Sequence, residues 1–143
     1  MDLIKEANYI FKTQRPKYFT DYKHCEECNE HNTTLSNSHI DLIGLKELGN
    51  DFWDPICFVN NEGYLYYFPA FVRLAVKSGE DNYYITQFLF HLKEDRIKQM
   101  TAEQKKFLLK FLNYLMETKE ELIESYDDKT QLSAAINLVK KLS

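Results

Sequence analysis

Imidazole and thiol groups are concentrated in one short segment, which reads His24-Cys25-Glu26-Glu27-Cys28. On a helix that turns about 100° per residue, His24 and Cys28 lie one turn apart on the same face and Cys25 lies near its edge. Zinc binds such nitrogen and sulfur ligands at about 2.0 to 2.3 Å, and residues spaced i, i+3 or i, i+4 can share one ion. The segment therefore predicts a zinc site built on His24, Cys25 and Cys28.

A complete zinc site needs a ligand from elsewhere, because the sequence has no second Cys-x-x-Cys pair. Cys57 is the predicted fourth ligand, and His39 and His91 are its alternatives. The simplest competing interpretation is that the cysteines are buried as small apolar side chains and no cofactor is bound. Redox chemistry is disfavoured, because Glu26 and Glu27 are expected to raise the pKa of the thiols and no predicted strand precedes them.

Aromatic side chains form a second group of interest in the middle of the chain. Trp53 and Asp54 precede Tyr66 and Tyr67, and together they are candidates for the lining of a binding pocket. Filling of the core explains the aromatic residues more simply. The sequence lacks both a glycine-rich phosphate loop and a G-x-S-x-G motif, so it predicts no catalytic residues and leans against an enzyme.

The charge balance is acidic and uneven. The 143 residues have a formal charge of −4, and residues 1–70 hold eleven acidic and six basic side chains, a net charge of −5. This balance argues against nucleic-acid binding and favours encounter with a basic partner, for which Glu26, Glu27 and Glu30 are candidate contacts. No apolar run of membrane-spanning length and no signal-peptide pattern is present, and three cysteines fit reduced thiols. We therefore expect a cytoplasmic protein that does not bind membranes.

The elements that must position these residues are predicted to be helical. With 44% hydrophobic residues, four Gly and three Pro, the chain is expected to form one domain over 1–143, a compact bundle of about six helices. A Thr101 to Gln104 capping box gives the clearest helix start. A small β-hairpin near residues 56–67 is a further prediction, and its alternative is a loop that leads into a helix with Pro69 in its first turn. The six helices are expected near residues 3–14, 22–31, 70–77, 82–92, 101–126 and 130–142, with one or two further helical turns near 40–48.

Four motifs occur together in a characteristic order. They are HCEEC at residues 24–28, WDPICF at 53–58, YYFPAF at 66–71, and TAEQ at 101–104 followed by FLNYL at 111–115. In this order and spacing, over residues 20 to 116, the chain resembles a family of small bacterial proteins catalogued as a domain of unknown function. The resemblance implies a compact helical domain and brings no catalytic residues with it.

Two functional hypotheses from different classes follow. The first is a protein-binding module, such as an immunity-type inhibitor whose acidic N-terminal half meets a basic toxin. The second is a zinc-binding protein or small-molecule enzyme that uses His24, Cys25 and Cys28. The oligomeric state and the identity of the partner are not specified by the sequence.

Overall fold

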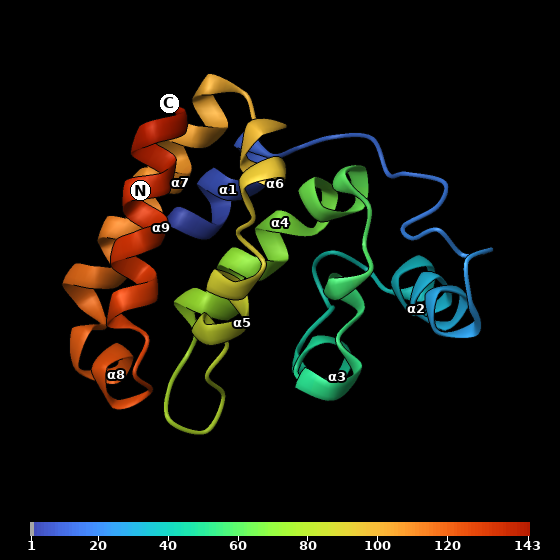
Figure 1. Cartoon of the computed structure of the whole chain (residues 1–143), viewed down its shortest axis with the longest axis horizontal. Helices are drawn as coiled ribbons and strands as arrows, with labels where there is room; N and C mark the ends of the chain where they lie inside the picture. Colours follow the sequence, from blue (N-terminus) through green and yellow to red (C-terminus); the bar gives the residue numbers. More distant parts are fainter. Residues whose placement is uncertain (1) are drawn as a thin grey trace.

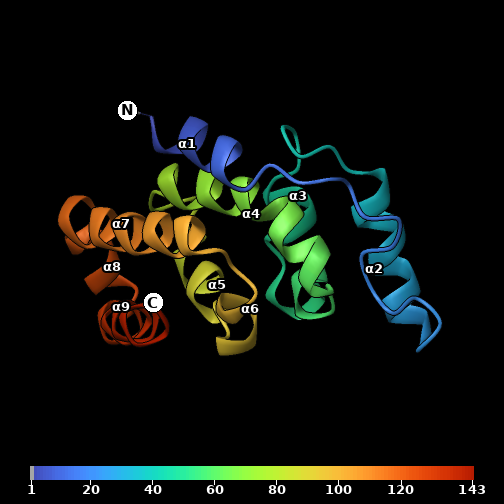
Figure 2. The same ribbon diagram turned by 90° about the horizontal axis from the view of Figure 1, so that it is seen from above.

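The computed structural model describes residues 2–143 and confirms a mainly helical fold. Figure 1 shows α4 near the middle, with α7, α8 and α9 at one end of the molecule and α2 at the other, and Figure 2 shows the same order from above. Within the described residues there are nine α-helices and two 3₁₀ helices. They are α1 (Leu3–Ile10), α2 (Glu26–Asn37), α3 (Leu45–Leu48), η1 (Asp51–Trp53), η2 (Pro55–Cys57), α4 (Asn61–Val76), α5 (Ile85–Phe90), α6 (Glu94–Lys98), α7 (Ala102–Thr118), α8 (Glu120–Ser125) and α9 (Lys129–Leu142).

Helix α4 forms the centre of the hydrophobic core, because apolar side chains occupy most of its circumference. Phe68 has no exposed surface. Its ring lies 4.3 Å from that of Phe11 and 5.8 Å from that of Phe88, measured between ring centroids. Side chains from the end of α1 and from α5 therefore meet on this one helix.

The predicted hairpin near residues 56–67 is wrong. Helix α4 already begins at Asn61, because the side chain of Asn60 accepts a hydrogen bond from the Gly63 N–H at 2.7 Å and so caps the helix. The turn-forming residues before Gly63 thus start a helix, and Pro69 lies inside it rather than in its first turn. Between residues 2 and 143 the β structure is limited to one isolated bridge, between Thr20 and Val59.

The capping box at the start of α7 is confirmed. The Gln104 N–H donates to the Thr101 hydroxyl at 3.1 Å, and the Thr101 N–H donates to the Gln104 side chain at 3.0 Å. The helix ends earlier than predicted, at Thr118, and a separate short helix α8 follows. Such short helices account for the difference between nine helices and the expected six.

None of the helices in residues 2–143 combines the length and the apolar character that crossing a bilayer requires.

Candidate metal centre

Helix α2 begins four residues later than its predicted start at Tyr22. The His24 N–H closes a turn by donating to the Asp21 carbonyl at 3.0 Å. Cys25 is extended and caps α2, because its sulfur accepts a hydrogen bond from the Cys28 N–H at 3.3 Å. His24 and Cys25 therefore precede the helix, and only Cys28 lies in it.

Despite this shift, the three predicted ligands converge at the start of α2. The sulfur atoms of Cys25 and Cys28 are 3.2 Å apart, and Cys28 Sγ lies 3.6 Å from His24 Nδ1. One donor atom from each residue lies within 4.8 Å of the other two. His24 and Cys25 are exposed, whereas Cys28 is 5% exposed. We call His24, Cys25 and Cys28 the thiol centre.

The two thiols of the centre have opposite acid–base properties. The Cys28 N–H, the Cys28 thiol and His24 lower the pKa of Cys25 to about 7. The pKa of Cys28 is raised by its hydrogen bond with Cys25, by burial, and by nearby negative charge that includes Glu27. The expectation that the acidic neighbours raise both thiol pKa values therefore fails at Cys25, where hydrogen bonds at the helix start lower the pKa.

The backbone of the thiol centre is held by the segment before it. The Thr20 hydroxyl donates to the Cys28 carbonyl at 2.6 Å, and the Asn32 side chain accepts from the Phe19 N–H at 2.7 Å. The Thr20–Val59 bridge ties this segment to the residues before α4. These contacts fix the first turn of α2 to the core.

The structure does not bring Cys57 into the thiol centre. Cys57 lies with Asp54 and His91, within 4.8 Å donor to donor, beside a cavity of about 220 Å³. Asp54 Oδ2 accepts from Gln87 at 2.9 Å and lies 2.7 Å from His91 Nε2, while Asp54 Oδ1 accepts from the Ile56 N–H at 2.9 Å. Both carboxylate oxygens are thus committed to protein donors.

Electrostatics also separate this second cluster from the thiol centre. Burial acts to raise the pKa of Asp54, but the hydrogen bond and charge of His91, with the hydrogen bonds from Gln87 and Ile56, together lower it below the ordinary value. Burial and the charge of Asp54 raise the pKa of the Cys57 thiol. Cys57 is therefore a poor nucleophile, and the cluster joins η2 to α5 as a structural network.

The acidic candidates all lie in the first half of α2. Glu26 and Glu30 are exposed, and Glu27 contacts the buried His31 at 3.2 Å. Trp53 is 42% exposed and lies against His31, with the ring centroids 4.8 Å apart. Glu27 and Trp53 therefore both contact His31, and Glu26 and Glu30 lie on the same helix as His31.

The remaining pocket candidates differ in how deeply they are buried. Tyr67 has no exposed surface, and its hydroxyl donates to the Leu35 carbonyl. Tyr66 is half-buried and accepts a hydrogen bond from Arg15 at 3.2 Å, and Asp54 is 5% exposed. Core packing, the simpler interpretation, thus accounts for Tyr67, whereas Tyr66 and Asp54 each line a small cavity, of about 230 Å³ and about 220 Å³ respectively.

Comparison with known proteins places these features in one matched region. Residues 14–136 match a family of unknown function (DUF6714). The chain belongs to this family. The DUF6714 match includes the thiol centre and the Asp54 cluster, and it supports the resemblance to a domain of unknown function. No curated protein and no solved structure matches the chain. The functional argument for this DUF6714 member therefore depends on the geometry of its own sites.

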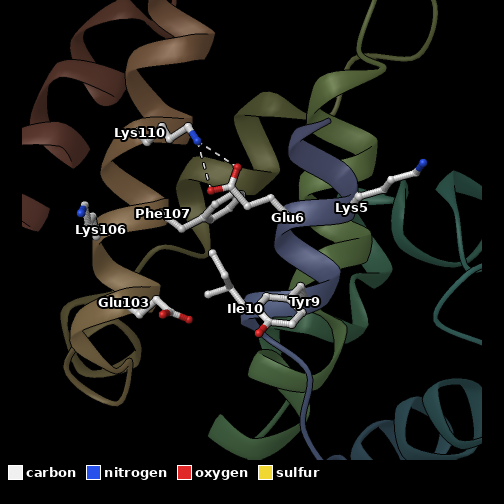
Figure 3. Close-up of a pocket in the computed structure, with 8 residues that line it drawn as sticks. All are labelled: Lys5, Glu6, Tyr9, Ile10, Glu103, Lys106, Phe107 and Lys110. Atoms are coloured by element: carbon white, nitrogen blue, oxygen red, sulfur yellow. Dashed lines mark hydrogen bonds and ion pairs between the residues drawn. The ribbon is translucent and has the colours of Figure 1, made fainter. Parts of the chain in front are cut away.

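A groove between α1 and α7 lies partly outside the DUF6714 match and was missed by sequence reasoning (Figure 3). Lys110 bridges it by pairing with Glu6 at 2.9 Å, and Ile10 and Phe107 form its apolar floor. Its volume is about 710 Å³. The lining residues contain no His or Cys, and they are Lys5, Glu6, Tyr9, Ile10, Glu103, Lys106, Phe107 and Lys110.

Proposed function

We propose that the chain binds a zinc ion through His24, Cys25 and Cys28. The observation that carries the proposal is the convergence of three zinc-type donor atoms within 4.8 Å of one another. Two of these donors are thiols and one is an imidazole nitrogen, a combination that selects zinc over hard cations such as magnesium.

The distances within the thiol centre suit a tetrahedral ion. Sulfur atoms bound at about 2.3 Å in tetrahedral geometry lie about 3.8 Å apart, and a sulfur and an imidazole nitrogen lie about 3.6 Å apart. Cys28 Sγ and His24 Nδ1 are already 3.6 Å apart. The two sulfurs, at 3.2 Å, need to separate by about 0.6 Å, which a side-chain rotation of the exposed Cys25 provides.

The fourth coordination position faces solvent, because His24 and Cys25 are exposed. Three protein ligands with one exchangeable position are typical of zinc sites that bind water, a small molecule or a donor from another chain. The proposed zinc therefore serves as a binding point at the surface rather than as a closed structural site.

The test is zinc content and affinity of the purified chain, with Co²⁺ as a spectroscopic substitute. We expect one ion per chain, and we expect Cys28→Ser and Cys25→Ser to lose it, because a serine hydroxyl is a far weaker zinc ligand. Cys57→Ser is the matched control and should keep full binding, since Cys57 belongs to the Asp54 cluster. A folded wild type that takes up no zinc, or equal binding by Cys28→Ser, contradicts the proposal.

A second function, binding of a basic protein partner, is favoured by exposed aromatic residues beside the acidic side of α2. Phe52 is 96% exposed, Trp53 is 42% exposed and Phe58 is 38% exposed. The Trp53 and Phe58 rings both lie against His31 of α2, next to Glu27. Exposed aromatic side chains with an acidic surround suit a partner with apolar anchors and basic side chains, as an inhibitor of a basic toxin would require. We call Phe52, Trp53 and Phe58 the aromatic surface.

The aromatic surface is tested by the affinity of a basic protein that co-purifies with the chain. We expect Trp53→Ala to weaken binding by at least about 2 kcal/mol, a factor of about 30, if Trp53 is a central anchor. Added salt should slow association, because the charged residues are exposed. Tyr9→Ala, at an 80% exposed position on α1, is the control and should bind as the wild type does. Equal loss in both variants, or none in either, contradicts this role.

A further inference from the structure

Cys25 and Cys28 differ sharply in accessibility although their sulfur atoms are close. Cys25 is exposed, whereas Cys28 is 5% exposed, and the sulfurs are 3.2 Å apart. Both are free thiols. Stepwise thiol–disulfide exchange needs this asymmetry, because one thiol must reach an external disulfide and the other must be held within reach of the first.

We propose that Cys25 and Cys28 form a dithiol pair that reduces exposed disulfides by thiol–disulfide exchange. In the first step Cys25 releases its proton to solvent, and its sulfur attacks one sulfur of the substrate disulfide. The substrate S–S bond breaks, a mixed disulfide forms on Cys25, and the other substrate sulfur leaves and takes up a proton.

In the second step the Cys28 sulfur, after loss of its proton, attacks Cys25 Sγ and breaks the mixed disulfide. The remaining half of the substrate leaves as a thiol, and a Cys25–Cys28 disulfide remains. The substrate disulfide has then gained two electrons and two protons, and the two cysteines have lost them.

The start of α2 supports each step. The Cys28 N–H points at Cys25 Sγ from 3.3 Å, so the helix start stabilises negative charge on the attacking sulfur. The Thr20 hydroxyl holds the Cys28 carbonyl at 2.6 Å, which keeps the resolving thiol beside Cys25. Burial of Cys28 restricts an external disulfide to Cys25.

The substrate is defined by its chemistry, an accessible disulfide, which can belong to a small molecule or to a protein. Glutathione disulfide probes the first source, and insulin probes the second. Reaction with glutathione disulfide alone assigns a small-molecule substrate, and reaction with insulin as well assigns protein disulfides. Reaction with neither overturns the proposal.

The decisive measurement is mass spectrometry of reduced, metal-free protein after exposure to glutathione disulfide. The wild type should end with a Cys25–Cys28 disulfide and no lasting adduct, whereas Cys28→Ser should keep glutathione on Cys25. Cys57→Ser should match the wild type. The wild-type peptide map is informative even if a variant does not fold. A lasting glutathione adduct on Cys25 of the wild type, or modification mainly of Cys57, overturns the proposal.

This activity does not require zinc, but bound zinc would occupy both sulfurs, so the two properties are alternatives within one molecule, and His24→Ala separates them. The variant loses one proposed zinc ligand but keeps both sulfurs, so zinc affinity should fall while disulfide formation persists. Failure of zinc binding in a protein that still forms the Cys25–Cys28 disulfide leaves the dithiol proposal standing alone, and the reverse result leaves only the zinc proposal.

Discussion

Replacing Asp54 by Ala is expected to lower the free energy of unfolding by about 3 to 5 kcal/mol, the range for removing one partner of a buried charged network. Asp54 is 5% exposed and accepts hydrogen bonds from Gln87, His91 and the Ile56 N–H. Its loss leaves buried donors of η2 and α5 without an acceptor, and such donors are costly. Urea denaturation at pH 7 measures the change.

Asp51→Ala is the matched control for this substitution. Asp51 is exposed and lies three residues away in η1. A change of no more than about 0.5 kcal/mol is expected there, as for most surface positions. If Asp54→Ala is as stable as Asp51→Ala, the hydrogen bonds of Asp54 do not hold η2 against α5.

Because of the same network, the free energy of unfolding is expected to fall as the pH falls. The pKa of Asp54 lies below its ordinary value of 3.8 in the folded chain. Its contribution is therefore complete above that ordinary value and is lost as the pH falls through the lower native pKa. Asp54→Asn, which carries no charge, should lose less stability than the wild type between neutral pH and this acidic range. Parallel acid profiles of the two proteins would contradict this assignment.

Local signals in the sequence explain which elements were predicted well. The Thr101–Gln104 box was found because both partners lie within four residues and each satisfies the other's backbone N–H. The hairpin prediction failed although its signal was also local. The residues Asn60 to Gly63 suit a turn and a helix N-terminus equally well, and packing of the aromatic residues of α4 decides for the helix.

The residues of the thiol centre were predictable from the sequence, but the opposite pKa shifts of its two thiols were not. The spacing of His24, Cys25 and Cys28 brings them together in a helix or at its start, so their convergence did not depend on the exact boundary. The pKa of the Cys25 thiol, in contrast, depends on where the helix begins. Once the helix begins at Glu26, Cys25 becomes the N-cap and accepts a hydrogen bond from the Cys28 N–H, and this bond with those of the Cys28 thiol and His24 lowers its pKa.

The periodicity of the sequence could not predict contacts between residues that are far apart in the chain. Asp54 and His91 are 37 positions apart, and Glu6 and Lys110, which bridge the groove, are 104 apart. No spacing rule joins such pairs, because their meeting depends on how helices pack around α4. The prediction of Cys57 as the fourth zinc ligand is the clearest case, because the fold places this thiol beside Asp54 and His91 instead.

Phe68→Ala is expected to destabilise the chain by about 3 to 5 kcal/mol, as for other large-to-small changes of buried Phe. The side chain has no exposed surface, and its ring contacts Phe11 and Phe88. The deleted ring leaves a cavity that helix α4 cannot close, because α4 is packed on several sides. Thermal and urea denaturation should both report the loss.

Phe52→Ala separates this role in the core from a role at the surface. Phe52 is 96% exposed, so its removal should change stability by no more than about 0.5 kcal/mol. As part of the aromatic surface it should nevertheless weaken binding of a basic partner. A stable Phe52→Ala protein with reduced affinity would show that Phe52 contacts a partner beside α2 and, unlike Phe68, does not stabilise the core. A marked loss of stability in this variant would instead place Phe52 in the packed interior and remove it from the proposed surface.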